Sequence, residues 1–359
     1  MKKLIIIIPI VLLLVIGCGQ QKKDLIQPEV YTKAEVDTLI NSIREETKQS
    51  IDLLVKKQEQ GDSAISDNSA EFNNYRKNIT SIQIPDSVSF CGQIIPLDRP
   101  DVRQTFEKVL YFYIDDQPQL MLYKQRSNLF FPIMDSMLIE AGLPTDIKFI
   151  AVIESALKPS AVSRAGAKGF WQFMYWTADR HEITNNQSVD MRNNLIASTA
   201  GAILYLKSLY EKFDDWFLAM AGYNRGETGL KKDIKEQGTR DYFELIFPKR
   251  ETDEYVPRAA AVKLILEDPD RFGIPQEEIV PWVAPKTESV SVRVRNRLKV
   301  RWVADWCQTT YRQIKLFNPE LKGDKWGPGR YEISIPSGQS ENFYQGLKDI
   351  KSGKYKIPN

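Results

Sequence analysis

The stretch Phe149-Ile-Ala-Val-Ile-Glu154-Ser155 places one carboxylic acid at the end of an apolar run. Apolar residues recur all along the segment from Ile147 to Leu157, which predicts a buried helix that Pro159 stops. A carboxyl group in apolar surroundings tends to keep its proton, because burial disfavours the charged form. A glycosidic oxygen needs a protonated acid in order to leave. Glu154 is therefore the first candidate for a catalytic residue.

Three further segments follow Glu154, and their residue types suit a site that holds a sugar chain. They are Gly166-Ala-Lys-Gly169-Phe-Trp171-Gln172-Phe-Met, Ala221-Gly-Tyr223-Asn224-Arg-Gly226 and Glu251-Thr-Asp-Glu-Tyr255-Val-Pro257. Gln172 offers a donor and an acceptor to an acetamido group. Gly166 and Gly169 would let the backbone approach a sugar without steric cost. Ser155 would either hydrogen-bond near the Glu154 carboxyl or cap the end of its helix.

In this order the four segments resemble the soluble-lytic-transglycosylase-type catalytic domain, over residues 96–269. The resemblance implies a mainly α, lysozyme-like fold. It also implies an enzyme that cleaves the MurNAc–GlcNAc β-1,4 bond of peptidoglycan without water and gives 1,6-anhydromuramyl products. Glycan strands would be its partner, and neither a metal nor an organic cofactor would be needed.

The resemblance also implies a role for individual residues. Glu154 would be the single general acid and base, and the substrate's own N-acetyl group would stabilise the cationic intermediate. Tyr223 and Asn224 would line the cleft, and Tyr255 would place its hydroxyl beside Glu154. Glu251 would hold the helix that carries the tyrosine. Together the expected substrate-binding residues are Ser155, Gly169, Gln172, Tyr223, Asn224 and Tyr255.

Two other functions stay open on sequence alone. A hydrolase on the same fold would need a second acid, for which Asp179, Glu182 and Asp190 are candidates that no motif places. A non-catalytic protein that binds the cell wall would need no acid. Phe170 and Trp171 could stack on pyranose rings, although burial of one of them fits the sequence equally well.

Composition excludes several other classes. The 359 residues predict about two domains. A net charge of +2 argues against nucleic-acid binding driven by bulk charge. One histidine, His181, and three scattered cysteines are too few for a histidine-based metal cluster or a zinc site. Cys91 and Cys307 are expected as unpaired thiols rather than a disulfide, because they are far apart in sequence.

The N-terminus reads as a targeting signal. Lys2 and Lys3 precede an apolar run over residues 4–16, too short for a comfortable membrane span. Val15-Ile-Gly-Cys18 resembles a lipobox, which implies a signal peptide at 1–17 and a lipidated Cys18 that anchors an envelope protein facing the periplasm. Gly19, in place of an aspartate retention signal, favours the outer membrane. An ordinary signal peptide or an uncleaved anchor remains the alternative.

Residues 18–85 are predicted to be a polar stalk, with a helix at 34–57 whose apolar residues recur every three to four positions. Residues 86–285 would form the catalytic domain, including separate helices at 117–128 and 130–141. The sequence does not indicate an oligomeric state.

After Pro285 the apolar period changes from 3.6 to 2, which predicts a strand with a basic face from about Ser291. Two short helices and a closing strand at 331–336 would follow. This order resembles the βααβ LysM module, with Asn318-Pro319 and Ile335-Pro336 at matching positions, although the usual Gly-Asp-Thr is absent. The module is expected at 286–340, with a C-terminal tail at 341–359.

Overall fold

A computed structural model describes residues 82, 84–274 and 282–352, which belong to one compact unit, Asn74–Asn359. The expected signal peptide, the lipidation site Cys18, and the stalk with its helix at 34–57 lie outside the described residues, apart from the last few positions of the stalk. Within the described part of the chain, no helix is both long and apolar enough to cross a membrane.

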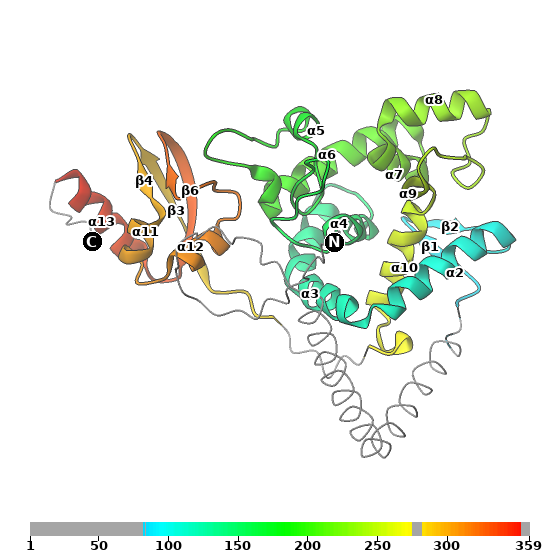
Figure 1. Ribbon diagram of the computed structural model, residues 1–359, viewed down its shortest axis with the longest axis horizontal. Helices are drawn as coiled ribbons and strands as arrows, with labels where there is room; N and C mark the ends of the chain where they lie inside the picture. Colours follow the sequence, from blue (N-terminus) through cyan, green and yellow to red (C-terminus); the bar gives the residue numbers. More distant parts are fainter. Residues whose placement is uncertain (1–81, 83, 275–281, 353–359) are drawn as a thin grey trace, which may run out of the picture. The chain divides into compact units, whose positions relative to one another are not determined.

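The mainly α fold predicted from the sequence is confirmed (Figure 1). The helices of the catalytic region are α2 (Pro100–Asp115), α3 (Gln117–Glu140), α4 (Lys148–Ser155), α5 (Tyr175–Arg180), α6 (Leu195–Phe213), α7 (Trp216–Arg225), α8 (Glu227–Gln237), α9 (Arg250–Asp253) and α10 (Tyr255–Glu267). Added to these are the 3-10 turns η1 (Thr145–Ile147), η2 (Met191–Asn193) and η3 (Asp270–Phe272), and a hairpin of β1 (Val88–Phe90) and β2 (Gln93–Ile95).

Helix α4 is the buried centre of this region, as its apolar sequence predicts. Residues 149–153 are all buried, and the helix contacts α3 and α10. Phe149 meets Phe131 of α3 edge to face, with ring centroids 5.3 Å apart. On α10, residues 259–261 are three buried alanines, whose small side chains let that helix pack closely. The core therefore fixes the position of the segment that carries Glu154.

Helix α4 ends earlier than the sequence suggested, at Ser155 rather than beside Pro159. Ala156 and Leu157 both adopt a left-handed conformation, with φ of 55°, which terminates the helix. Arg126 of α3 donates a hydrogen bond of 2.9 Å to the carbonyl of Ala156, so a carbonyl just beyond the helix end finds a partner. The early stop puts Glu154 in the last turn.

Helix α3 corrects the expectation of two helices at 117–128 and 130–141. It runs unbroken from Gln117 to Glu140 with Pro132 inside it. Proline removes one backbone donor and crowds the carbonyl four residues earlier, at a cost of about 3 kcal/mol. Met134 and Leu138, both fully buried, anchor the half that follows the proline. Tertiary packing therefore overrides the local signal.

The C-terminal module has its own apolar core. Its elements are β3 (Thr287–Val294), β4 (Leu298–Lys299), α11 (Val300–Trp306), α12 (Tyr311–Phe317), β5 (Lys325–Trp326), β6 (Gly329–Pro336) and α13 (Ser340–Lys351). Strands β3 and β6 pair antiparallel, with Val290 opposite Ile333. Asn318 links α12 to β6, because its side chain donates to the carbonyls of Ile314 and Ser334 at 2.8 Å each.

Residues 341–351, expected within a C-terminal tail, instead belong to helix α13 (Ser340–Lys351). Phe343 is fully buried, and its ring lies edge to face with Trp306, with centroids 5.9 Å apart. Gly346 lies directly against the Trp306 ring, where an added Cβ would come within 2.3 Å. The helix therefore completes the core of the module.

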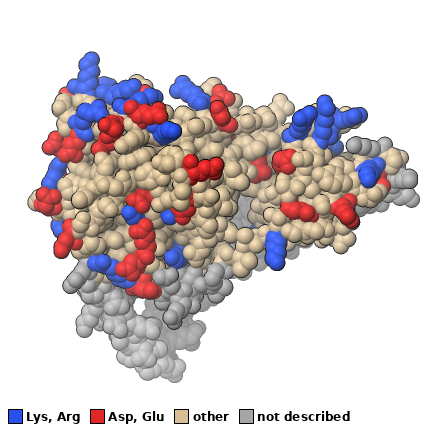
Figure 2. All heavy atoms as spheres, turned by 180° about the vertical axis from the view of Figure 1, so that it is seen from behind, with Lys and Arg blue, Asp and Glu red and all other residues tan. Residues whose placement is uncertain are grey.

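The cysteines and the surface charge agree with the sequence analysis. Cys91 and Cys307 are free and buried. Figure 2 shows basic and acidic side chains interspersed over much of the face that it displays, with wide neutral areas between them. This distribution fits the net charge of +2.

Candidate active site

Glu154 is half-buried in the last turn of α4. The hydroxyl of Tyr255 donates a hydrogen bond of 2.5 Å to its Oε1 atom. Burial raises the pKa of Glu154 from 4.5 to about 7, against the opposing effects of the Tyr255 hydrogen bond and the Arg258 charge; the charge of Glu251 adds a smaller rise. Burial dominates because the ionised form loses its hydration.

This geometry suits one carboxyl group for two tasks. The hydrogen bond from Tyr255 engages Oε1, so the proton of the acid form resides on Oε2. A pKa of about 7 means that both the acid and the carboxylate are populated near neutral pH. Such a group can give up a proton in one step and accept one in the next.

One interpretation of the sequence was that Ser155 hydrogen-bonds near the Glu154 carboxyl. The structure does not show this contact. The buried Oγ of Ser155 lies 2.8 Å from the carbonyl oxygen of Phe170 and 3.0 Å from that of Ala151. The bond to Ala151 is the helix-end alternative, and the bond to Phe170 ties α4 to the segment at 166–173. Ser155, the residue next to Glu154, therefore helps to fix the position of the segment at 166–173.

Glycine at position 169 is required by the protein's own backbone. Its φ is +81°, and a Cβ added there would lie 1.7 Å from the carbonyl oxygen of Arg192. Gly166 has φ of +88°, but nothing lies within 4 Å of an added Cβ. Gln172 also has a positive φ, 48°, and its side-chain amide donates to the Gly169 carbonyl at 2.8 Å. The backbone at Gly169 thus lies close to η2, whereas the sequence analysis expected it to lie close to a sugar.

Of the two possibilities left open for Phe170 and Trp171, burial holds for both, at 2% and 0% exposure, and stacking on sugar rings does not. The indole nitrogen of Trp171 donates to Thr199 at 3.0 Å. The exposed aromatic side chains of this part of the chain are Tyr175 and Trp176, at 44% and 72%. Nothing in the sequence pattern distinguishes the buried from the exposed aromatic residues.

Tyr223 and Asn224 lie at the end of α7 and contact two other segments of the site. The Tyr223 hydroxyl donates to the carbonyl of Trp171 at 2.6 Å, and burial raises the pKa of this tyrosine well above its usual value. The side-chain oxygen of Asn224 accepts a hydrogen bond of 2.7 Å from Thr252. Both residues therefore connect α7 to neighbouring segments.

Two residues that support the site were missed by sequence reasoning. Thr252 is fully buried, whereas Glu251, which was expected to hold the tyrosine-bearing helix, is exposed. The anchoring contact from this segment to α7 thus comes from the threonine. Arg258 donates to the carbonyl of Ile153 at 3.2 Å. Its position three residues after Tyr255 was the available signal, because such residues share a helix face.

None of the acids considered for a hydrolase is among the groups that shift the pKa of Glu154. The Asp190 carboxylate forms a buried ion pair with Arg192, while Asp179 and Glu182 are exposed. Among the described residues, no group of three histidine, cysteine, aspartate or glutamate side chains is arranged to hold a metal ion.

The class of this domain follows from comparison with known families. Residues 134–246, which include Glu154, Gln172, Tyr223 and Asn224, match the family model "Transglycosylase SLT domain". This part of the chain is therefore an SLT-type domain, as the sequence segments indicated.

A named relative is similar over a longer stretch. The chain is 29% identical over 212 residues to membrane-bound lytic murein transglycosylase D of Escherichia coli strain K12, covering 57% of this chain and 46% of the relative. The chain thus spans about half the length of this curated relative.

Two solved structures are also similar in part. An inactive mutant of lytic transglycosylase Slt from Pseudomonas aeruginosa gives a TM-score of 0.32 at 23% identity, over 42% of this chain and 25% of that one. The 70 kDa soluble lytic transglycosylase of Escherichia coli gives 0.33 at 18% identity, over 50% of this chain and 33% of that one.

Proposed function

We propose that this chain is a peptidoglycan lytic transglycosylase in which Glu154 is the single general acid and base. The SLT-domain match and the likeness to a lytic murein transglycosylase support the reaction class. The observation that carries the choice of residue is the pKa of Glu154, raised to about 7 beside the Tyr255 hydroxyl. Only a group with a pKa near the working pH can serve efficiently in both roles.

The proposed reaction has two steps. Protonated Glu154 gives its proton to the oxygen that joins N-acetylmuramic acid to N-acetylglucosamine; the bond from this oxygen to muramyl C1 breaks, and N-acetylglucosamine leaves with a hydroxyl group. The substrate's N-acetyl group stabilises the resulting cation. The Glu154 carboxylate then takes the proton of the muramyl 6-hydroxyl, whose oxygen bonds to C1. Glu154 ends protonated, and no water is consumed.

The surrounding residues are proposed to hold the glycan. Gln172, Tyr223 and Asn224 would line the cleft, where the two amide groups offer donors and acceptors to acetamido and hydroxyl groups. Ser155 and Gly169 would contribute by shaping the segment at 166–173, in line with their contacts to Phe170 and η2.

The proposal extends to the place of the protein in the cell. The lipobox-like sequence at Cys18 and the likeness to a membrane-bound lytic murein transglycosylase support a lipoprotein in the envelope, facing the periplasm and held in the outer membrane. Residues 286–340 would be a LysM-like module that binds peptidoglycan. Labelling of the wild type, but not of Cys18→Ser, with radioactive palmitate would support the anchor, and labelling of both would refute it.

The reaction is tested by incubating residues 19–359 with purified sacculi beside Glu154→Gln and Glu182→Gln. We expect 1,6-anhydro-muropeptides from the wild type and the Glu182 variant and none from the Glu154 variant, as measured by mass spectrometry. Products with reducing ends would identify a hydrolase, because hydrolysis adds water. Binding to sacculi without soluble products from any protein would identify a wall-binding protein instead.

A further inference from the structure

The C-terminal module contacts the segment 185–193 that lies between α5 and α6. Val189 and Leu321 form an antiparallel bridge. The Asp190 amide donates to the carbonyl of Glu320, and the Lys322 amide donates to the carbonyl of Ser188, at 2.8 Å each. The module therefore pairs with this segment through backbone hydrogen bonds around an isolated β-bridge, rather than touching it through side chains alone.

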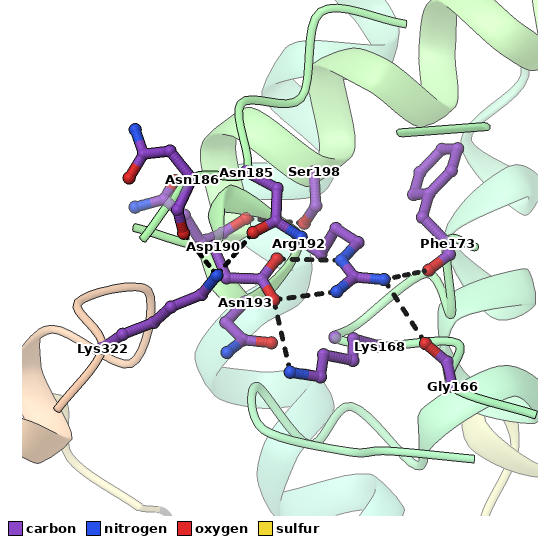
Figure 3. Close-up of polar contacts among 12 residues, drawn as sticks. Gly166, Lys168, Phe173, Asn185, Asn186, Asp190, Arg192, Asn193, Ser198 and Lys322 are labelled. Atoms are coloured by element: carbon purple, nitrogen blue, oxygen red, sulfur yellow. Dashed lines mark hydrogen bonds and ion pairs between the residues drawn. The ribbon is translucent and has the colours of Figure 1, made fainter. Parts of the chain in front are cut away.

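Side chains reinforce this pairing. Val189 and Leu321 are both buried and share the module's apolar core. The Lys322 ammonium donates to the Asn185 side chain at 2.6 Å and to the Asn186 carbonyl at 2.5 Å (Figure 3). Asn193 donates to the carbonyl of Pro319 at 3.1 Å. These contacts are both apolar and charged, which distinguishes them from an incidental surface encounter.

The paired segment carries a buried ion pair. Arg192 donates through Nε and Nη2 to the two Asp190 oxygens, at 2.8 and 2.9 Å. The two residues are 4% and 1% exposed. The remaining nitrogen, Nη1, donates to the carbonyls of Phe173 at 3.1 Å and Gly166 at 3.4 Å. Figure 3 shows the Arg192 guanidinium reaching both the Asp190 carboxylate and the carbonyls of Gly166 and Phe173.

The segment 166–173, whose carbonyls accept hydrogen bonds from Arg192, belongs to the candidate active site. It contains Gly169, which touches the Arg192 carbonyl, and Gln172. Its Phe170 carbonyl accepts from Ser155, the residue after Glu154. A continuous series of contacts thus runs from Lys322 through segment 185–193 to the residues around the proposed acid.

We propose that the C-terminal module is a structural brace for the active site, and that Asp190 and Arg192 are positioning residues for the segment 166–173. The pairing through Leu321 and Lys322 holds segment 185–193, and Arg192 passes that order to the glycan-binding segment. The role in catalysis rests on the proposed function, but the ordering of the segment does not. A misplacement of about 1 Å at such a segment can cost about a hundredfold in rate.

The brace is tested in the full chain with Lys322→Met and a matched control, Lys325→Met. Lys325 lies in the same module and carries the same charge, but its side chain is exposed. Amide hydrogen exchange followed by mass spectrometry reports local order without requiring turnover. We expect Lys322→Met to speed exchange over 166–173 and 185–193 by about tenfold, because hydrogen bonds to a charged group are lost. Lys325→Met should match the wild type.

A second variant tests the positioning role. Arg192→Lys keeps the charge but cannot reach the carboxylate and both carbonyls with one planar group. We expect kcat on glycan strands to fall at least about tenfold, with an unchanged pH profile because Glu154 keeps its surroundings. Exchange over 166–173 should speed up, while exchange in α6 and α7 stays unchanged, which separates positioning from general unfolding.

The outcomes are distinguishable. Unchanged exchange over 166–173 in Lys322→Met overturns the brace, and unchanged exchange there in Arg192→Lys overturns the positioning role. Faster exchange with full activity overturns the positioning role. A wild type that turns over no glycan overturns the proposed function, while the exchange measurements still decide whether the module orders the segment.

Discussion

Replacing Glu154 with glutamine should stabilise the protein at neutral and alkaline pH while abolishing its proposed activity. The glutamine keeps an oxygen that can accept from Tyr255, but it carries no charge to bury. Ionising Glu154 in the folded state is unfavourable, because burial raises its pKa from 4.5 to about 7. A pKa shift of this size lowers the free energy of unfolding by about 3 kcal/mol once Glu154 is ionised.

Because the pKa of Glu154 is raised on folding, the wild type loses stability as pH rises. The unfolded chain ionises Glu154 near pH 4.5, but the folded protein does so only near 7. Below pH 4.5 the group is protonated in both states and the wild type pays no penalty. Between the two values the folded wild type loses stability as pH rises, and above pH 7 the loss is complete.

The measurement is thermal unfolding of the wild type and Glu154→Gln from pH 4.5 to pH 8. The melting temperatures should be similar at pH 4.5 and should diverge to a difference of about 6–12 °C at pH 8, for a domain of this size. Glu182→Gln, with an exposed side chain, should follow the wild type within about 0.5 kcal/mol at every pH. A difference between Glu154→Gln and wild type that does not grow with pH would refute the reasoning.

Four further substitutions have definite expected outcomes. Tyr255→Phe removes the hydrogen bond that lowers the pKa of Glu154, so the pH–rate profile of muropeptide release should move upward by about one unit; an unmoved profile would contradict this. Gly169→Ala should cost more than about 2 kcal/mol in urea unfolding, because its Cβ would clash with the backbone of η2. Gly142→Ala, with φ of +70° but open space, should cost only about 1 kcal/mol, and equal losses would argue against the clash. Phe343→Ala should destabilise the C-terminal module by about 3–5 kcal/mol in the same assay, whereas a loss under about 1 kcal/mol would mean that α13 is not part of the module's core.

The helical fold could be predicted because the decisive segments are locally consistent. The apolar run at 149–153 was predicted to lie in a buried helix, and it does so in α4. The apolar surroundings of Glu154 could also be predicted, because it follows an apolar run and no other acid lies between Ser155 and Trp176. Where the local pattern and the tertiary packing agree, sequence reasoning gives the element and the burial of its side chains.

The errors occur where distant packing decides. Nothing near Pro132 in sequence reveals that buried Met134 and Leu138 keep α3 continuous. Likewise, the requirement for glycine at 169 comes from the carbonyl of Arg192, twenty-three positions further along the chain. Contacts of this kind depend on how segments meet in space, and a periodic pattern carries no information about them.

Glu251 offers the sharpest distinction between the transglycosylase and a hydrolase. It is the acid whose charge raises the pKa of Glu154, so a hydrolase would have to use it, or an acid outside the described residues, to activate water. In the one-carboxylate reaction its charge only helps Glu154 keep a proton. Glu251→Gln should therefore retain turnover and move the pH profile of muropeptide release to lower pH, opposite in sign to Tyr255→Phe, while Glu182→Gln leaves the profile in place. Complete loss of turnover by a folded Glu251→Gln protein would instead make Glu251 a second catalytic carboxylate and overturn the single-acid mechanism.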